Sequence, residues 1–422
     1  MGSLKKTVSY FKRNGLRKTF YMCLQRLREQ YRERDYDRLR LLEIVSEEEY
    51  RAQKEYSFSK DIFMSLLVPA YETRKEYLRQ LIDSVLAQSY GSFELIIADA
   101  GKSSGVRETV EEYSDSRIIY KKLAENGGIA ANTNSALELA RGDVILLLDH
   151  DDLLERDALF HIAKAFEEGA LFVYTDEDKL SEGRRGSHYF SPNRKPDFDL
   201  ELLYSNNYIC HLTAMDAALL KAAGGFRPEY DGAQDYDLFL RCIEKMAEKD
   251  FYIPQGRIVH VPRVLYHWRV HELSTADNPE SKLYAYEAGR RALEDMLKRR
   301  GIKGRAEHSE HLGFYRIDYE PEEEAVSVNI PEGYVASEEN FKRKAAGYFS
   351  RPEIRSISFR LLDKDGRVLE GPFKGMADWD SGFMHRAAFG CCIDRECCAF
   401  VKRADGGGSL DIYTPEITFK KK

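Results

Sequence analysis

Apolar blocks and periodic stretches alternate through the middle of the chain, and together they predict alternating strands and helices. Strands are predicted at 63–68, 93–98, 117–120 and 144–148, and helices at 76–88, 106–113 and 129–140. Pro69 is expected to stop the first strand, and Asp99 follows the second. Short connections between such elements are typical of a mostly parallel sheet covered by helices. We therefore predict an α/β fold in which Pro69 and Asp99 share one edge of the sheet.

The most informative block is 144–148, where five apolar residues are followed at once by acids. Such a run predicts a strand buried on both faces, with Asp149, Asp151 and Asp152 at its carboxyl end. Carboxylates this close repel one another unless a cation or protons neutralise them. Mg²⁺ and Mn²⁺ prefer oxygen ligands, and two carboxylates suffice where substrate phosphates supply the rest. The alternative is a solvated acidic loop after a core strand, since acid pairs in loops are common.

The sequence beyond the acids continues the same pattern. Helices are predicted at 157–167, 217–222 and 238–246, and strands at 171–174, 207–215 and 259–268. A second acidic run, 175–179, is expected at the carboxyl end of a strand and before a long loop of the kind that is usually functional. Asp235 and Asp237 precede a strongly periodic helix. The dipole at the amino terminus of that helix favours their ionised forms, and either residue could instead serve only as the helix cap.

Two further polar groups allow more than one interpretation. His267, Arg269 and His271 follow the last predicted strand, and these residue types suit metal or phosphate as well as a polar surface. A glycine pair, 127–128, precedes a predicted helix but lacks the spacing of a phosphate-binding loop. Most such glycines simply permit a turn.

Length and composition exclude several classes of protein. A chain of 422 residues allows one large α/β domain plus something smaller, and an apolar content of 43% is that of a globular protein. No apolar run approaches 18 residues, so no membrane-spanning helix is predicted, and the amino terminus lacks the apolar core of a signal peptide. The seven cysteines match no zinc spacing and predict no disulfide framework. We therefore expect a reducing, cytoplasmic setting.

Charge is strongly segregated toward the amino terminus. Residues 1–28 carry eight Lys or Arg and no acid, although the whole chain has a net charge of −7. Apolar residues recur there at three- and four-residue steps, which predicts an amphipathic basic helix. Such a helix can lie on an anionic membrane surface, or it can pack its apolar stripe on its own catalytic domain. Nucleic acid is not an expected partner, because the remainder is acidic and no binding motif is present.

Six short motifs, taken in order, resemble those of one enzyme family. They are LLVPAYE at 66–72, LIIADAG at 95–101, NGGIAAN at 126–132, LLDHDD at 147–152, QDYDL at 234–238 and YHWRVH at 266–271. The ordered set resembles the family 2 glycosyltransferases, in particular the bacterial branch that builds cell-surface polysaccharides. The resemblance covers about residues 62–305 and implies the GT-A fold.

The resemblance implies roles for individual residues. The implied substrate-binding residues are Pro69, Tyr71, Glu72, Asp99, Asn126, Asp149 and Arg269, the first four around the nucleoside and Arg269 at the diphosphate. Asp149 and Asp151 look like the Asp-x-Asp motif that holds the metal, and His271, with His267 as second choice, looks like the histidine that completes it. Asp235 looks like the general base. Ala100 departs from the family, which often has a second Asp there, and so leaves the nucleotide open.

The implied activity is that of a metal-dependent, inverting hexosyltransferase. It would use Mn²⁺ or Mg²⁺ to move a sugar from a UDP-, dTDP- or GDP-linked donor to a growing cell-surface glycan or lipid-linked acceptor. A metal can stabilise the charge that develops on the departing diphosphate, and one carboxylate can take the acceptor proton. We expect a cytoplasmic enzyme. The basic helix could also attach it peripherally to the inner face of the cell membrane.

Three segments are predicted: a basic helical segment and linker (1–60), a GT-A domain (61–305) and an accessory region (306–422). A hairpin is predicted over 357–369 and another strand pair over 388–403 in the accessory region, which is either a reduced, noncatalytic second glycosyltransferase domain or an unrelated small β-rich module. Two other functions compete. A sugar nucleotidyltransferase would need a glycine-rich basic loop near its amino end, which is missing, and an inactive scaffold of a glycan-assembly complex would need a misplaced Asp151 or Asp235.

Overall fold

The computed structural model describes residues 38–183, 186–248, 251–270, 283–309, 312–322, 326–362, 368–370, 400–404 and 409–421, and the single positions 11, 16, 23 and 36. His271, most of the basic segment 1–28 and most of the predicted strand pair 388–403 lie outside these residues. None of the helices in the described ranges combines the length and apolarity needed to cross a bilayer.

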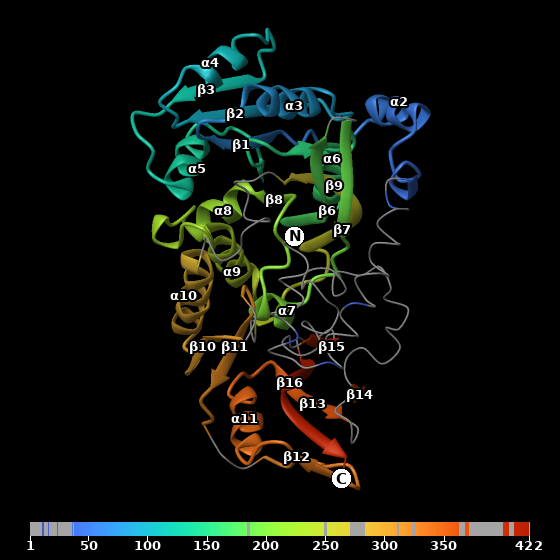
Figure 1. The fold of residues 1–422 in the computed structure, drawn as a ribbon, viewed down its shortest axis with the longest axis vertical. Coiled ribbons are helices and arrows are strands. Elements are labelled where there is room, and N and C mark those ends of the chain that lie inside the picture. The colour runs from blue at the N-terminus through green and yellow to red at the C-terminus, as the bar shows by residue number, and fades with distance from the viewer. Residues whose placement is uncertain are drawn as a thin grey trace.

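A nine-stranded mixed sheet forms the centre of the amino-terminal part (Figure 1). Its order is β3-β2-β1-β4-β8-β6-β9-β5, with β7 paired to β6. Strands β1 to β4 are parallel, whereas β8 runs antiparallel to both β4 and β6. The strands are β1 Met64–Ala70, β2 Phe93–Asp99, β3 Ile118–Lys122, β4 Val144–Leu147, β5 Leu153–Leu154, β6 Phe172–Gly183, β7 Gly186–Asn193, β8 Thr213–Asp216 and β9 Ile258–Arg269.

Helices cover both faces of this sheet. They are α2 Glu47–Glu55, α3 Lys75–Leu86, α4 Gly105–Val110, α5 Ile129–Leu137, α6 Ala158–Glu167, α7 Leu200–Ser205, α8 Ala217–Ala223, α9 Gln234–Met246 and α10 Leu283–Arg300, with a short 3₁₀ helix at Pro228–Tyr230. Alternate strand residues point to opposite faces, so Leu66 and Leu146 pack with α3, α4 and α6, while Leu67 and Ile145 pack with α5 and α7 to α10. Two apolar layers therefore bury the central strands on both sides.

Pro69 does not stop β1, which continues to Ala70. The carbonyl oxygen of Ala70 points toward β2 and accepts a hydrogen bond from the Ala100 N–H. Because the backbone groups of successive strand residues point to opposite sides, those of Pro69 point toward β4. Pairing of β1 with β4 ends at Leu67 opposite Leu147. The missing N–H of Pro69 therefore leaves no ladder bond unmade, and the prediction was wrong because it ignored which side of the strand the proline faces.

The second acidic run is also placed differently from the prediction. Residues 175–179 lie inside β6, which continues to Gly183 and forms a hairpin with β7 where a long loop was expected. The strand predicted over 207–215 is shorter, and β8 begins only at Thr213. Helix α9 begins at Gln234, so Asp235 belongs to its first turn instead of preceding it.

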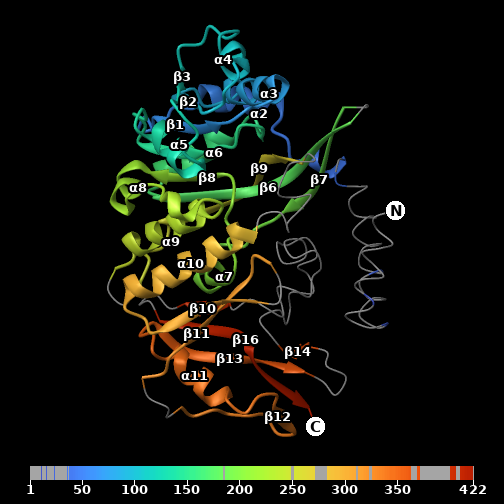
Figure 2. The same ribbon diagram turned by 60° about the vertical axis from the view of Figure 1, so that its left-hand side comes forward.

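The carboxyl-terminal part adds a hairpin and a second sheet (Figure 2). The hairpin pairs β10 Gly304–His308 with β11 Tyr315–Tyr319. The sheet has the order β12-β16-β13-β14, with β15 on β16, and its elements are β12 Tyr334–Ala336, α11 Phe341–Tyr348, β13 Ile354–Leu362, β14 Val368–Glu370, β15 Phe400–Ala404 and β16 Leu410–Lys421. Antiparallel pairing of β13 with β14 confirms the hairpin predicted over 357–369.

This second sheet packs directly on the first part of the chain. Ile354 and Tyr413 belong to the same apolar cluster as helices α7 to α10. Arg351 is fully buried and its Nη2 lies 2.6 Å from Glu201 Oε1 on α7. A buried charge pair of this kind needs both partners, so the two sheets belong to one packed body.

Candidate active site

The three acids after β4 have different environments. The side chains of Asp149 and Asp151 are 39% and 18% exposed, whereas Asp152 is buried. Asp152 accepts hydrogen bonds from the Arg269 backbone N–H (2.7 Å) and from the Tyr266 hydroxyl. Burial, together with the charges of the two neighbouring acids, raises the pKa of Asp152 well above its usual range. Asp152 therefore anchors the loop to β9, whereas the side chains of Asp149 and Asp151 are only partly buried.

Arg269 also has a structural position. Its side chain is 1% exposed, and its Nε donates to the Asp151 carbonyl oxygen over 2.6 Å. Its two terminal nitrogens bind Glu182 Oε1 (2.7 Å) and Gln80 Oε1 (2.6 Å). The guanidinium is thus occupied by the protein and shapes the acidic loop. Each of its three nitrogens already binds a protein oxygen, and the predicted diphosphate contact stays a prediction.

Asp235 lies in the first turn of α9, where Asn207 Nδ2 donates to its Oδ2 over 2.9 Å. Burial raises the pKa of Asp235 above its usual 3.8, and this effect outweighs the favourable influence of His211, the Tyr236 backbone N–H and Asn207. The sequence-based expectation that the helix dipole would govern the ionisation was therefore wrong in direction. A carboxylate with a raised pKa is a stronger proton acceptor.

Asp237, two residues further on, has a different role. It is fully buried, and it binds Arg241 Nη2 (2.6 Å) on its own helix and Arg227 Nε (3.0 Å) on the preceding loop. The residue before the helix, Ala233, is its N-cap, so neither acid caps α9 with its side chain. Asp237 holds α9 to its surroundings, whereas the Asp235 side chain binds Asn207.

His211 is a site residue that the sequence did not point to. Its Nε2 lies 3.6 Å from Asp149 Oδ2, and its ring stacks on Tyr266 at 4.9 Å between centroids. Its Nδ1 is buried and has no hydrogen-bond partner in the described structure. The charges of both His211 and Asp149 act on Asp235. The structure therefore brings together Asp149, His211 and Asp235, residues that lie far apart in the sequence.

The register of β8 explains this meeting. β8 runs antiparallel to β4, with Thr213 opposite Leu147, and the same register continued two residues beyond this last pair puts His211 opposite Asp149. The turn that carries His211 is held from behind by Lys195, whose buried Nζ binds the carbonyl oxygens of Ile209 and His211. Asn207 and His211 were inside a predicted strand, where only the strand pairing could have identified them.

The residues expected around a nucleoside lie at the same edge of the sheet, at the ends of β1 and β2. Asp99 is fully buried and accepts from Tyr120 Oη (2.8 Å), Lys122 Nζ (2.9 Å) and the backbone N–H of residue 101 (2.8 Å). Glu72, with φ 48°, accepts from the backbone N–H groups of residues 102 (2.5 Å) and 103 (3.2 Å). Pro69 lies in β1 just before these residues, and Tyr71 is 46% exposed.

Asn126 shapes the loop before α5. Its Oδ1 accepts from the Gly128 backbone N–H (3.1 Å) and from Asn132 Nδ2 (2.9 Å). Asp231 accepts from the Ala130 backbone N–H over 3.0 Å, at the amino end of that helix. Gly128 has φ 92°, and a Cβ there would lie 2.0 Å from an Asp231 oxygen, so the position requires glycine. Because Asp231 already binds the Ala130 N–H at this helix end, the glycine pair permits the turn and is not a phosphate-binding loop.

The second acidic run is structural. Asp176 binds His260 Nε2 (2.8 Å), Glu177 faces Lys195 Nζ (3.4 Å), and Asp178 Oδ1 lies 2.6 Å from His267 Nδ1. His267 Nε2 in turn faces Glu155 Oε2 at 3.3 Å. Both nitrogens of His267 are therefore occupied, which removes the second-choice metal histidine. Within the described ranges no group of three or more His, Cys, Asp or Glu side chains is arranged to hold a metal.

Comparison with known proteins gives one family. Residues 65–222 match the family model for "Glycosyl transferase family 2". The uncharacterized protein y4gI of Sinorhizobium fredii is 42% identical over 243 residues, which are 56% of this chain and 25% of that protein. The O-antigen biosynthesis protein RfbC of Myxococcus xanthus is 32% identical over 249 residues, 58% of this chain and 18% of that protein. The chain thus spans a quarter or less of the length of these two relatives.

A solved structure, Staphylococcus aureus TarS 1–349 in complex with UDP-GlcNAc, is 20% identical and has a TM-score of 0.42. It is matched over 56% of this chain and 67% of that chain, a similarity too low to transfer its ligand. The family match and the sheet topology agree with the fold implied by the motifs. Residues 65–222 of the chain therefore lie in a family 2 glycosyltransferase domain with the GT-A fold.

Proposed function

We propose that this chain is a metal-dependent, inverting glycosyltransferase that moves a sugar from a nucleoside diphosphate sugar to a growing cell-surface glycan. The observation that carries the proposal is the meeting of Asp149, His211 and Asp235 at the carboxyl edge of β4, inside a domain of the family. Ligands of open α/β sheets bind at this edge. The proposed transfer needs two carboxylates there, one to bind the metal and one to act as the general base.

The residues present fit a hard divalent cation that shares its ligands with a diphosphate. Asp149 and Asp151 are accessible carboxylates, while Asp152 is held by the protein. Mg²⁺ and Mn²⁺ are commonly bound by one or two carboxylates plus substrate phosphates, so the lack of a third protein ligand among the described residues is compatible with this site. When bound, the cation would supply Lewis-acid stabilisation of the departing diphosphate.

Asp235 is the proposed base. The acceptor hydroxyl gives its proton to the Asp235 carboxylate as its oxygen forms the new bond to the anomeric carbon, and the bond from that carbon to the diphosphate oxygen breaks. Asn207 fixes the carboxylate through the bond to Oδ2. One base and one direct displacement give inversion at the anomeric carbon. Pro69, Tyr71, Glu72 and Asp99 would hold the nucleoside at the neighbouring strand ends.

The acceptor is proposed from the relatives. RfbC is named as an O-antigen biosynthesis protein, and 58% of the present chain aligns with it at 32% identity. A cell-surface polysaccharide or its lipid-linked precursor is therefore the proposed acceptor class. Attachment of the basic segment 1–28 to an anionic inner membrane surface would bring the enzyme to such a precursor.

The test is a donor screen followed by product analysis. The melting temperature of the full-length chain is measured with UDP-, GDP- and dTDP-sugars, with and without Mn²⁺. We expect one nucleotide to raise it only when Mn²⁺ is present, and that donor then to be consumed in an Asp235-dependent reaction. Because bound ligand stabilises the folded state, the shift grows with ligand concentration. A folded chain that none of these donors stabilises, with or without metal, would contradict the proposed activity.

A further inference from the structure

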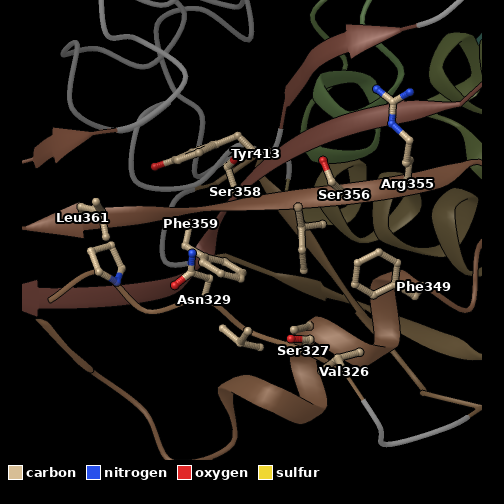
Figure 3. Close-up of a pocket in the computed structure, with 14 residues that line it drawn as sticks. Val326, Ser327, Asn329, Phe349, Arg355, Ser356, Ser358, Phe359, Leu361 and Tyr413 are labelled. Carbon is tan, nitrogen blue, oxygen red and sulfur yellow. The ribbon is translucent and has the colours of Figure 1, made fainter.

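A groove of about 440 Å³ lies in the carboxyl-terminal sheet (Figure 3). It is bounded by β13, by the segment 326–331 and by the end of α11. Residues that point to both faces of β13 line it, so the groove follows an edge of that strand. β13 pairs with β16 along its other edge, and in the ranges described here β14 covers only Leu361 and Leu362. The volume lies within the range of small-ligand sites.

Neutral polar groups and aromatic rings line this groove together. Ser356 and Ser358 lie on one side of β13, and Asn329 lies on the side of Phe359 (Figure 3). The Phe349 ring, at the end of α11, is 40% exposed. The Ser356 hydroxyl donates to Asp411 Oδ1 over 2.6 Å and so can only accept from a ligand, whereas an amide such as that of Asn329 can both donate and accept. Ring faces bind apolar C–H surface. A sugar offers both kinds of surface, hydroxyls at its rim and C–H groups on its faces.

The groove carries no uncompensated charge among its lining residues. Its one charged residue, Arg355, is paired with Asp411 through Nη2–Oδ2 (2.6 Å) and Nε–Oδ1 (3.1 Å). A phosphate or nucleotide would need a free cation or a bound metal. The lining therefore favours a neutral ligand over a second nucleotide-sugar donor.

Tyr413 provides an independent sign that a ligand belongs here. Its side chain lines the groove, yet the residue is only 1% exposed and its hydroxyl has no hydrogen-bond partner in the described structure. Buried hydroxyls are nearly always paired, because leaving one unpaired is unfavourable. A ligand that offers a hydroxyl would supply the missing partner.

We infer that this groove binds a neutral oligosaccharide segment of the acceptor glycan, at a point remote from the reacting end. That the bound glycan is the acceptor depends on the proposed function, whereas binding of a neutral oligosaccharide in the groove does not. Arg351, just before β13, is ion-paired with Glu201 on α7, and α7 leads directly to Asn207, which holds Asp235. A glycan held in the groove would therefore be held by the same packed body as the base, which raises its effective concentration there.

An extended peptide added to the edge of β13 that faces away from β16 is the competing occupant. Main-chain hydrogen bonds would hold such a strand. It would not require the Ser327 hydroxyl and the Asn329 amide on the walls, nor a partner for the Tyr413 hydroxyl. The lining thus favours the glycan.

The test measures binding by the full-length chain to a panel of neutral tri- to hexasaccharides, with ligand-observed NMR and calorimetry at millimolar concentration. Tyr413→Phe removes only the unpartnered hydroxyl and is expected to fold normally. It should weaken binding about 3- to 10-fold, the loss typical of one neutral hydrogen bond. Asn329→Ala should weaken binding similarly. Asn340→Ala, an exposed residue of the same region that does not line the groove, is the matched control and should bind as the wild type does.

The outcomes separate the groove from the catalytic proposal. Binding of an oligosaccharide that Tyr413→Phe and Asn329→Ala both weaken supports the groove, even if no transfer is ever detected. In a transferring enzyme, the same variants should raise KM for long acceptors and leave kcat unchanged. No binding by any panel member, equal binding by all variants, or groove-dependent binding of an extended peptide instead of a sugar would overturn the inference.

Discussion

Replacing Asp235 with Asn should separate catalysis from stability. The raised pKa of Asp235 reflects burial. A group whose pKa is higher in the folded than in the unfolded protein stabilises the fold fully below its unfolded pKa, and this contribution is lost as the pH rises through the folded value. Near neutral pH the ionised carboxylate therefore lowers the free energy of unfolding relative to a neutral side chain. Asn stays neutral and its Oδ1 can still accept from Asn207, so we expect an unchanged or higher melting temperature.

The rate should respond in the opposite sense. An amide cannot take the proton of the acceptor hydroxyl, and loss of a general base lowers turnover by about 10²- to 10⁴-fold. A loss of 10²-fold corresponds to about 2.7 kcal/mol in the barrier. The wild-type rate should also fall as the pH drops through the raised pKa of Asp235, because only the ionised form accepts the proton. Single-turnover transfer and thermal unfolding measured on the same sample give both quantities.

Asp237→Asn is the matched comparison on the same helix. It neutralises a fully buried carboxylate that binds Arg241, whose side chain is 7% exposed, and Arg227, whose side chain is 26% exposed. Breaking a buried ion pair typically costs about 3–5 kcal/mol of stability. We therefore expect a lower melting temperature with a nearly normal rate per folded molecule. If Asp235→Asn instead melted lower and kept its turnover, Asp235 would be a structural residue, and the assignment of the base would be wrong.

Three further results are expected. Stripping the enzyme with EDTA should abolish transfer, and Asp151→Ala should lose the Mn²⁺-dependent stabilisation by nucleotide; full turnover by a verified metal-free enzyme would contradict the metal site. His211→Gln removes a group that lowers the pKa of Asp235, so the acid limb of the pH–rate profile should move to higher pH, and an unmoved limb would show that the two side chains are not coupled. Deleting residues 1–28 should reduce sedimentation with anionic liposomes at low salt while transfer to a soluble acceptor persists; a full-length chain that ignores such liposomes would favour a structural helix instead.

The sequence predicts the central strands well because their environment is uniform. β1, β2 and β4 lie between two helical layers, so almost every residue is apolar and the block pattern is unambiguous. β6 was cut short because its second half carries Asp176, Glu177 and Asp178. Local patterns assign acids to loops, yet each of these is buried beside a histidine or lysine brought in by another segment. Only the fold could supply those partners.

The same distinction divides the site residues. Asp149, Asp151 and Asp235 could be placed from their neighbours in sequence, since strand ends and helix starts are local features. The contacts of Arg269 could not, because Gln80, which binds its Nη2, lies 189 positions away in the sequence. His211 was missed for the converse reason. Nothing near it in sequence is distinctive, and it reaches Asp149 only because β8 runs antiparallel beside β4.

The buried link between α7 and the second sheet also decides how the carboxyl-terminal region can be studied. Glu201 is 2% exposed and depends on Arg351 for its charge partner. A truncation before Arg351 would leave that carboxylate buried and unpaired, at a cost of about 3–5 kcal/mol, a large part of a domain's stability. Because α7 leads to Asn207 and so to Asp235, such a truncation would disturb the base without removing any catalytic group. Loss of activity in a truncated chain therefore cannot show that the region takes part in chemistry. Point changes such as Tyr413→Phe, which leave the Glu201–Arg351 pair intact, distinguish a role in binding from a role in support.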